Sequence, residues 1–584
     1  MNKKIITLQL ILLMCLFAFT QASAQQWGLY TLYATKNGTQ AFLVDTANTP
    51  VTYKTWNFAT DRKTVYSAYM TLGDTIVRNY KPAANTWNTG PIHGGLQKVR
   101  WDGTVVWDWT YFLTNGYSLH HDICPMPNGN ILCISYDYRT AAEATAAGSS
   151  TAVVMYCEKI IEVHPTGVGT NSALWGGTVV WEWKLWDHLC QNTSSAKPNY
   201  VTSFATNPQW LNINYAGTGT APDKWHMNGI DYNPTLNQIV VSMHFMNSVF
   251  VIDHSTTTAE AAGHTGGNAG KGGDFLYRWG NPASYGATGT TIFNVVHDAH
   301  WVPSDNANYP NYLAGFNNNS GTGNSKVEIW NPPLAGSNYT LTSGVATPPS
   351  YGYEYTSVFT SNNEGNSQQL PNGNMLVNNS FGAVYEVNAA GTQLWTKANT
   401  SSSHAYRYSL CYVRGPIATA GASSTSVVSG TPVTLNSSAL SVTETNPIYT
   451  YSWSPATMTN PNIANPVVTP IATTNYTVLI TNTSLGCTST ASVTINTTVG
   501  INENEKVANV TLFPNPTSGI INLSEDFASN EDFEIVVSNS IGKIILQTKN
   551  EKAIDLSAYC NGIYYVMIRA KNMNSINKKV ILIK

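Results

Sequence analysis

The feature that most constrains the fold is a repeat in the first two thirds of the chain. Its unit begins with a strand, a Pro-Asn-Gly-Asn turn and an apolar strand. A third strand follows, which ends in an acidic and an apolar residue, and Gly-Thr then precedes an aromatic strand. Copies occur at Pro127–Leu132, Ile160–Val163 and Gly177–Trp183, at Pro371–Leu376, Val384–Val387 and Gly391–Trp395, and more loosely at Asn233–Val240, Val249–Asp253 and Phe275–Trp279. Four recurring antiparallel strands predict the blades of a β-propeller, which bury their faces only against neighbouring blades.

Composition agrees with an all-β fold. Only 11% of the 584 residues are charged, against roughly 25% in ordinary soluble domains, and polarity comes from Asn, Thr, Ser, Gly and Tyr, which suit strands and turns. The propeller segment, 25–414, has about 390 residues, enough for six blades of about 65. The net charge of -3 without any basic tract argues against nucleic-acid binding, because phosphate recognition needs clustered Lys and Arg.

The first 24 residues read as a secretory signal peptide. Lys3 and Lys4 precede an apolar run, and Ala22-Ser23-Ala24 provides a small-residue cleavage site. A membrane anchor is the alternative, but no later stretch approaches the ~20 apolar residues that span a bilayer. We therefore expect a secreted or outer-surface protein that is exported through the periplasm and has no transmembrane anchor after processing.

Seven cysteines remain after removal of the signal, so at least one thiol is unpaired. A two-residue turn at Asn128-Gly129 would place Cys124 opposite Cys133, where a cross-strand disulfide is geometrically allowed. Pro125 and Pro127 could distort the ladder instead.

Two smaller modules follow. Residues 415–499 alternate Ser, Thr and Val around the lone Trp453, which predicts a small Ig-like β-sandwich. Residues 507–584 contain the run Phe513–Gly519, then short strands and Asn561–Val566. These motifs resemble the C-terminal sorting domain of the type IX secretion system, also a β-sandwich. The resemblance implies that the type IX machinery is a partner and that the domain is removed on export.

Histidines recur at one place in the propeller repeat. His121 and His297 each stand six residues before the proline of a turn, and His226 stands eight before Pro234. The blade at Pro371 has no histidine there, so the repeat itself does not require one. Because the innermost strand of each blade lines the central channel, these three imidazoles should meet at one mouth. Alternatively, each histidine is hydrogen-bonded within its own blade.

Strand alternation separates the neighbours of these histidines. Immediate neighbours in a strand point to opposite faces, so Asp122 and Asp298 should bond backbone or an adjacent blade, and His120 and His300 should pack within their blades. The remaining histidines of interest are expected to be ordinary loop or turn residues. They are His93, His164, His188, His254 and His264.

The residues around these histidines resemble a family. Ser118–Leu132, Trp225–Tyr232 and Val296–His300 together are similar to the bacterial aryl-sulfate sulfotransferases that use no nucleotide sulfate donor. The resemblance implies a six-bladed propeller that moves a sulfuryl group from an aryl sulfate ester to a phenol through a transiently sulfated histidine. On that comparison His297 matches the nucleophile, and His121 and His226 match its partners.

One position departs from the family pattern. Where the family has an arginine, this chain has His244, which could grip an oxyanion as arginine does only if it were protonated. Arg407, or failing that Arg139, could supply the missing cation.

Sulfuryl transfer depends on positioning and charge stabilisation, and it needs no cofactor or metal. A neutral imidazole can attack sulfur while a protonated one serves the leaving oxygen, and mutual repulsion helps keep their protonation states different. Two alternatives use the same fold. Three neutral histidines could hold Zn²⁺ or Cu²⁺ in a hydrolase, or the propeller could be a cell-surface binding or adhesion protein without catalysis.

Overall fold

The computed structural model describes residues 28–584 except 73–74, 320, 345–346, 442–443, 445, 457, 499–509, 525–531 and 571–574. Strands dominate, as the composition predicted, and the described α-helices are short: α2 (Ala141–Ala146), α3 (Thr258–Ala261) and α4 (Leu410–Arg414). No helix among the described residues is both long enough and apolar enough to cross a membrane. The predicted signal peptide, 1–24, lies outside the described residues.

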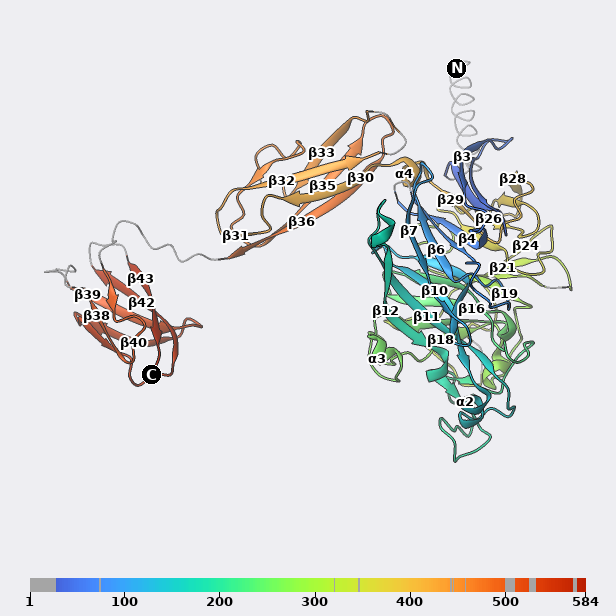
Figure 1. The fold of residues 1–584 in the computed structure, drawn as a ribbon, viewed down its shortest axis with the longest axis horizontal. Helices are drawn as coiled ribbons and strands as arrows, with labels where there is room; N and C mark the ends of the chain where they lie inside the picture. The colour runs from blue at the N-terminus through green and yellow to red at the C-terminus, as the bar shows by residue number, and fades with distance from the viewer. Residues whose placement is uncertain are drawn as a thin grey trace, which may run out of the picture. The chain divides into compact units, whose positions relative to one another are not determined.

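Six antiparallel sheets follow one another through the described part of residues 30–408 (Figure 1). The first has the strand order β29 (Ala405–Tyr408), β1 (Tyr30–Ala34), β2 (Gln40–Asp45), β3 (Thr52–Asn57). The second has β4 (Thr64–Met70), β5 (Ile76–Tyr80), β6 (Gly95–Val99), β7 (Val105–Thr110). The third has β12 (Gly176–Lys184), β11 (Met155–Thr166), β10 (Ile131–Arg139), β9 (Tyr117–Pro125), β8 (Phe112–Leu113).

The last three sheets have four strands each. The fourth has β15 (Met227–Asn233), β16 (Gln238–Met243), β17 (Ser248–Asp253), β18 (Tyr277–Trp279). The fifth has β19 (Val296–Trp301), β20 (Leu313–Asn317), β21 (Lys326–Trp330), β24 (Tyr353–Thr356). The sixth has β25 (Asn366–Gln369), β26 (Met375–Asn378), β27 (Val384–Val387), β28 (Gln393–Lys397). Small two-stranded sheets join β13 (Leu189–Cys190) to β14 (Leu211–Asn212) and β22 (Leu334–Ala335) to β23 (Asn338–Tyr339).

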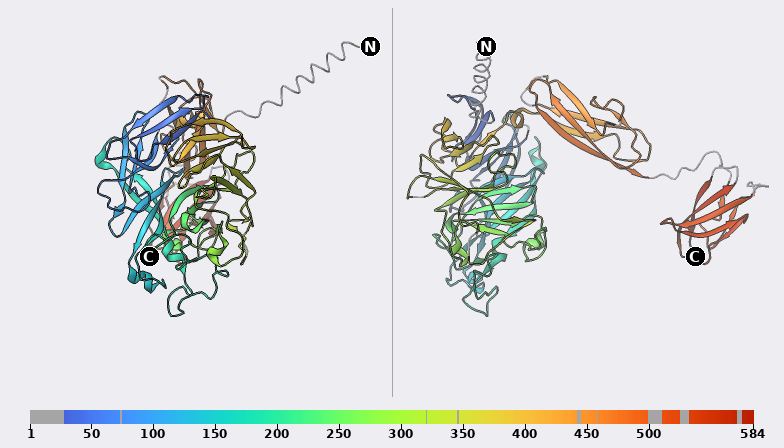
Figure 2. Two further views of the ribbon diagram at one scale, coloured as in Figure 1. Left: turned by 90° about the vertical axis from the view of Figure 1, so that its right-hand side faces the viewer. Right: turned by 180° about the vertical axis from the view of Figure 1, so that it is seen from behind.

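The six sheets form a propeller-like ring, which Figure 2 shows from two further sides. The first strands of successive sheets contact one another from β4 through β9, β15, β19 and β25 to β29. Strand β29 then pairs with β1, so a strand from residue 405 completes the sheet that begins at residue 30. The repeat read from the sequence therefore corresponds to successive strands of one sheet, as in β10 to β12 and β26 to β28.

Tryptophans of the outer strands join five of the six sheets to the next sheet. Buried indoles need a partner for their N–H, and here each Nε1 donates to a backbone carbonyl of the following sheet. These bonds are Trp56 to Arg100 (2.9 Å), Trp107 to Gly176 (2.6 Å), Trp183 to Gly273 (2.7 Å), Trp279 to Pro348 (2.8 Å) and Trp395 to Ala47 (3.1 Å). The last bond connects the sixth sheet to the first and closes the ring.

The acidic residue of the repeat has a structural role that explains Arg407. In the sixth sheet Asn374, the last residue of the Pro-Asn-Gly-Asn turn, donates to Glu386 Oε1 at 2.8 Å. The other oxygen of Glu386 receives Nη1 of the buried Arg407 at 2.7 Å, and the guanidinium lies 4.7 Å from the Trp395 ring. This corrects the expectation for Arg407, because its guanidinium is engaged between strands and is not brought to the histidines.

The Cys124–Cys133 disulfide that a two-residue turn would allow does not form. Met126 pairs with Asn130, so the turn holds three residues instead of two, with Gly129 at φ +87°. The longer turn shifts the register by one, which places Leu132 opposite Cys124 and sends the two sulfurs to different faces. Both thiols are free, and the disulfide found among the described residues joins Cys411 to Cys487.

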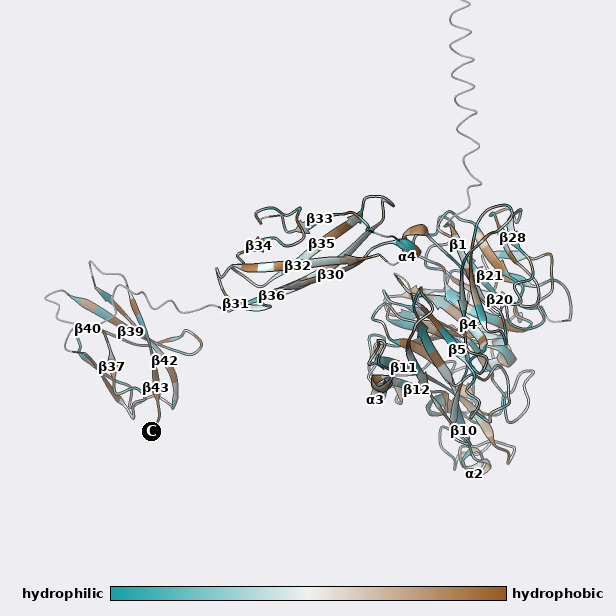
Figure 3. Cartoon of the chain, turned by 45° about the horizontal axis from the view of Figure 1, so that its top comes forward, coloured by the Kyte–Doolittle hydropathy of each residue, from teal (hydrophilic) through white to brown (hydrophobic). Residues whose placement is uncertain are grey.

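The two C-terminal modules each contain two sheets. One pair has β30 (Ile417–Ala422), β32 (Val433–Leu440), β34 (Val467–Val468), and β31 (Ser426–Val428), β36 (Thr488–Thr498), β35 (Thr474–Asn482), β33 (Tyr449–Ser454). The other has β37 (Leu512–Phe513), β38 (Ile520–Leu523), β41 (Ala553–Asp555), and β40 (Ile544–Lys549), β39 (Phe533–Asn539), β42 (Gly562–Ala570), β43 (Ile576–Leu582). Their strands carry apolar and polar residues in turn (Figure 3). The Ig-like class of the first module stays a prediction.

Candidate active site

Irregular backbone on the innermost strands positions the candidate residues. The pairing register shifts within β9, β15 and β19, which marks a β-bulge in each strand. His121 (φ +52°), His226 (φ +58°) and Asp298 (φ +52°) adopt left-handed conformations at or beside these bulges. Bulges re-aim side chains, and left-handed non-glycine residues each cost about 1–3 kcal/mol, so the surrounding sheets must hold this geometry in place.

The structure brings four histidines together in a row. The ring centroids lie 4.5 Å apart for His121 and His226, 5.2 Å for His226 and His244, and 5.3 Å for His244 and His297. His121 belongs to the third sheet and His297 lies on β19 of the fifth. In the fourth sheet, His226 directly precedes β15 and His244 directly follows β16. Histidines that are 176 residues apart in sequence thus share one site.

Hydrogen bonds define the tautomer of His297. Asn318 Nδ2 donates to the carbonyls of Ser361 (2.6 Å) and Glu364 (2.7 Å), so its Oδ1 faces His297 Nδ1 at 2.6 Å. Because this amide oxygen can only accept, Nδ1 carries the proton of the neutral ring. Nε2 keeps its lone pair and accepts the backbone N–H of Glu364 at 3.2 Å.

His226 is backed by a carboxylate that we did not predict from the sequence. Its Nδ1 lies 2.5 Å from Asp223 Oδ2, which also receives the hydroxyl of Tyr136 at 3.1 Å. A carboxylate in this position holds the proton on Nδ1 and stabilises an imidazolium when one forms. The other ring nitrogen is then the atom that can exchange a proton with a ligand.

His121 is the end of a buried chain of titratable groups. Its Nδ1 lies 2.7 Å from Nδ1 of His120, whose Nε2 lies 3.1 Å from Glu158 Oε2. We expected His120 to point away and pack within the blade, but the bulge breaks the alternation and sets the two rings 5.0 Å apart. Asp122 does bond backbone and an adjacent sheet, as expected, through Ile123 N (2.8 Å) and the Tyr69 hydroxyl (2.6 Å).

Burial keeps the imidazoles of His121, His244 and His297 neutral. Desolvation, followed by repulsion from neighbouring imidazoles, holds the pKa values of His121 and His297 well below their usual range, and burial does the same for the pKa of His120. The pKa of His244 falls to about 3 for the same reasons. His244 is therefore uncharged at neutral pH and cannot replace the fixed charge of an arginine.

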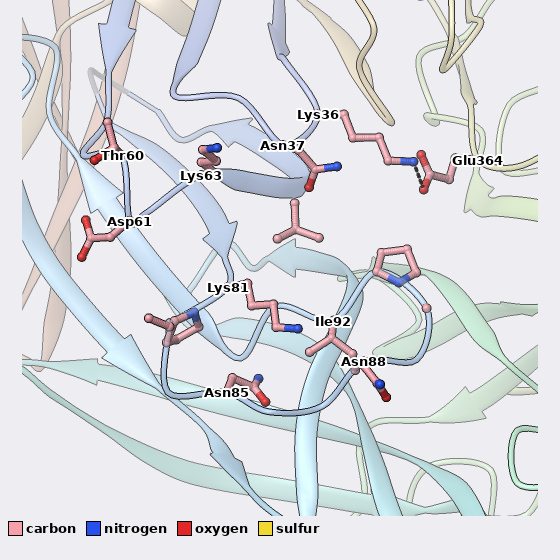
Figure 4. Close-up of a pocket in the computed structure, with 15 residues that line it drawn as sticks. Lys36, Asn37, Thr60, Asp61, Lys63, Lys81, Asn85, Asn88, Ile92 and Glu364 are labelled. Atoms are coloured by element: carbon pink, nitrogen blue, oxygen red, sulfur yellow. Dashed lines mark hydrogen bonds and ion pairs between the residues drawn. The ribbon is translucent and has the colours of Figure 1, made fainter.

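A cavity of about 870 Å³ lies next to the histidine row, and Figure 4 shows the residues that line it. Three lysines line it, and one of them, Lys36, forms an ion pair with Glu364 at 2.5 Å. The other two are Lys63 and Lys81. Gly90 forms part of the floor, where an added Cβ would lie 3.1 Å from Cε1 of both His121 and His226. Gly90 and Glu364, whose backbone N–H reaches His297 Nε2, thus place the cavity next to the imidazoles.

Metal binding by the histidine row has less geometric support. Among the described residues, the set of three His, Cys, Asp or Glu side chains whose ligand atoms all lie within 4.8 Å of one another is His188, His264 and Asp274, outside this row. The four imidazoles are spread along a line instead of converging on one point.

A family model for arylsulfotransferase (ASST) matches residues 34–410. The chain belongs to this family. A model for the secretion system C-terminal sorting domain matches residues 511–584 of the same arylsulfotransferase family member, which implies export to the outside or to the cell surface. No curated protein matches the chain.

Solved structures similar to this arylsulfotransferase family member differ widely in sequence. Three N-terminal domains of the bacteriophage RB49 Hoc protein are 15% identical (TM-score 0.15), and the chain spans 29% of its own length and 59% of theirs. BamB from Moraxella catarrhalis is 11% identical (TM-score 0.26), with 64% and 74% covered. The periplasmic gluconolactonase PpgL of Pseudomonas aeruginosa is 12% identical (TM-score 0.31), with 64% and 97% covered.

Several residues of the candidate site were not predicted from the sequence. Asp223 stands three residues before His226, a spacing that could have drawn attention to it. His404 and Tyr66 join the site through ring contacts, with Tyr66 5.4 Å from His121 and 4.9 Å from His404. Glu158 and Asn318 gave no local signal, because Glu158 lies on β11, two strands from the histidine strand β9, and Asn318 follows β20, next to β19.

Proposed function

We propose that this protein transfers a sulfuryl group from an aryl sulfate ester to a phenolic acceptor, with His297 as the transiently sulfated nucleophile and no cofactor. The observation that carries the proposal is the row of four buried imidazoles next to a cavity that three lysines line. Membership of the arylsulfotransferase family supports the same activity.

In the first half-reaction the lone pair of His297 Nε2 attacks the sulfur of the ester. An N–S bond forms, the bond between sulfur and the aryl oxygen breaks, and its electron pair leaves with the phenolate. The proton stays on His297 Nδ1, which donates it to Asn318 Oδ1 throughout, and this fixes Nε2 as the attacking atom. The Glu364 N–H that Nε2 accepts in the resting protein must be exchanged for sulfur, so the floor of the cavity has to move when the ester binds.

The leaving phenolate needs a proton, and the chain from Glu158 can supply one. Burial and the nearby Asp223 raise the pKa of Glu158 well above its usual range, so the neutral acid is favoured. Glu158 then donates to His120, His120 donates to His121, and His121 keeps a proton on Nε2. Transfer of that proton to the phenolate, followed by a shift along the chain, leaves Glu158 as the carboxylate. The acceptor phenol reverses these steps.

His226 and the lysines would stabilise charge. With Nδ1 of His226 bound to the Asp223 carboxylate, an Nε2–H of this ring would hold a sulfuryl oxygen or assist the leaving oxygen. Neutral His244 can donate one N–H to a second oxygen. Lys36, Lys63 and Lys81 attract the anionic ester into the cavity.

The fold supports a specific domain organisation. The six sheets and the tryptophan bonds that close the ring support a six-bladed propeller at 25–414, followed by an Ig-like sandwich at 415–499 and a sorting domain at 507–584. The type IX secretion machinery would recognise the last domain, after a signal peptide at 1–24 has directed the chain to the periplasm.

Turnover of 4-nitrophenyl sulfate in the presence of phenol tests the activity. We expect release of 4-nitrophenol that depends on the phenol and on His297. Absence of turnover with a range of aryl sulfates, together with saturable binding of glycans or proteins, would favour the binding-protein alternative.

A further inference from the structure

His188, His264 and Asp274 bring three metal-ligating groups together outside the histidine row. His188 ends the short 3-10 helix η2 (Leu185–His188), which follows β12 of the third sheet. His264 and Asp274 bracket a glycine-rich loop between β17 and β18 of the fourth sheet. The cluster therefore bridges two neighbouring sheets, beside the Trp183 to Gly273 bond that also joins them.

The hydrogen bonds of His188 leave its Nδ1 atom, an acceptor in the neutral ring, facing another acceptor. Nε2 lies 2.8 Å from the carbonyl oxygen of Ala261, which can only accept, so Nε2 carries a proton. In a neutral ring Nδ1 then presents a lone pair, and it faces the Asp274 carboxylate oxygen Oδ1 at 2.9 Å. Two acceptors at this distance repel each other unless a second proton or a cation compensates for their charge.

The surroundings of the cluster match those of a metal site. Histidines that bind metals usually donate their other ring N–H to a carbonyl or carboxylate, as His188 does to Ala261. The Asp274 carboxylate is held in turn by Nε1 of Trp210 at 2.9 Å. An added Cβ at Gly273 would lie 2.6 Å from His188 Nε2, so only glycine allows this approach. The buried His188 ring also stacks on Trp183 at an interplanar angle of 4°.

Distances and exposure fit a divalent transition-metal ion. Asp274 Oδ1 lies 2.7 Å from His264 Nδ1 and 2.9 Å from His188 Nδ1. With metal–ligand bonds of about 2.1 Å, neighbouring ligands lie about 3.0 Å apart at right angles and about 3.4 Å apart in a tetrahedron, so only a small opening is needed. The His264 side chain is 44% exposed, which gives an ion a way in and leaves positions for water.

We propose that His188, His264 and Asp274 bind one divalent ion of the zinc class, which fastens the glycine-rich loop to the neighbouring sheet. Two imidazole nitrogens and one carboxylate favour Zn²⁺, Ni²⁺ or Co²⁺ over Ca²⁺ and Mg²⁺, which prefer oxygen ligands. The site has a structural role and does not depend on the proposed sulfuryl transfer.

Zinc titration of the full chain, produced without a polyhistidine tag and stripped with EDTA, tests the site. We expect one tight equivalent of Zn²⁺ by calorimetry, an increase in Tm with ZnCl₂ and none with MgCl₂. His264→Ala should weaken this binding at least about 10-fold, because it removes a ligand from an exposed position. His164→Ala, a matched change at an exposed histidine on β11, should leave the binding unchanged.

Three results would overturn the proposal. They are the lack of a stoichiometric Zn²⁺ site in the wild-type chain, equal affinity in wild type and His264→Ala, and loss of the site in His226→Ala but not in His264→Ala. The last result would place the ion at the histidine row. Circular dichroism and the Tm of the EDTA-treated variants separate lost ligation from misfolding.

Discussion

The Nδ1 atoms of His120 and His121 lie 2.7 Å apart, so one ring donates a proton to the other. His120 is fully buried and reaches Glu158 with its second nitrogen, which makes it a link between a carboxyl group and the histidine row. A side chain that would otherwise be a packing residue thereby positions the proton of His121.

The chain of hydrogen bonds from Glu158 through His120 to His121 predicts a specific effect of Glu158→Gln. The amide keeps the shape and can donate to His120, but it cannot release the proton that the leaving phenolate requires. We expect kcat to fall by about 10²- to 10³-fold, within the range of general acid–base contributions, while KM for the ester changes little. Pre-steady-state release of 4-nitrophenol measures the effect.

The leaving group provides the control for Glu158→Gln. Esters of more acidic phenols need less protonation, so they should lose less rate in the variant. An equal loss for good and poor leaving groups would contradict the proton chain and indicate a structural role for Glu158.

Lys63→Gln should weaken binding of the ester without changing the chemical step. Lys63 lines the cavity, and a solvent-accessible charge contributes about 0.2–1 kcal/mol, which corresponds to a rise in KM of up to about 5-fold. The effect should shrink as salt concentration increases. Lys54→Gln on β3, outside the cavity lining, serves as the control and should leave KM as it is. A fall in kcat for Lys63→Gln at unchanged KM would contradict this role.

The neutral state of His244 makes the fold sensitive to acid. The unfolded imidazole has a pKa of about 6.5 and takes up a proton below that pH, whereas the pKa in the folded protein is about 3. His244 therefore does not lower the unfolding free energy above about pH 6.5. As the pH falls from there toward pH 3, the unfolding free energy decreases by up to about 1.4 kcal/mol per pH unit.

Urea unfolding of His244→Gln between about pH 6 and pH 4.5 checks this. The slope of unfolding free energy against pH should be smaller than in the wild type, by up to the amount that corresponds to the uptake of one proton on unfolding. His164→Gln, at an exposed position, should retain the wild-type slope. Equal slopes in wild type and His244→Gln would show that His244 is not neutral in the folded protein.

The parts of the structure that were predictable are those encoded by local periodicity. The equal offsets of His121 and His297 from their turns placed both on innermost strands, and the aromatic strands supplied the tryptophans of the ring. The failures have a common cause, since one extra residue in a turn or bulge reverses which face a side chain occupies. This reversal moved Cys124 away from Cys133 and brought His120 toward His121. Arg407 was misassigned because its partner, Glu386, lies on β27 of the sixth sheet, whereas Arg407 lies on β29 of the first.

The final prediction concerns His297, whose attacking nitrogen is defined by Asn318. A sulfated histidine requires ping-pong kinetics, in which the first phenol leaves before the acceptor binds. His297→Ala should abolish the burst of 4-nitrophenol and the gain of one sulfuryl group detected by mass spectrometry of alkali-quenched protein. Asn318→Ala keeps the nucleophile but removes the acceptor that holds the ring proton on Nδ1. It should therefore slow sulfation while leaving the intermediate detectable. Asn319→Ala, at the adjacent half-buried position, is the matched control. Turnover by His297→Ala at the wild-type rate would refute the mechanism. For the wild-type protein, double-reciprocal plots should give parallel lines, and intersecting lines would rule out the covalent intermediate.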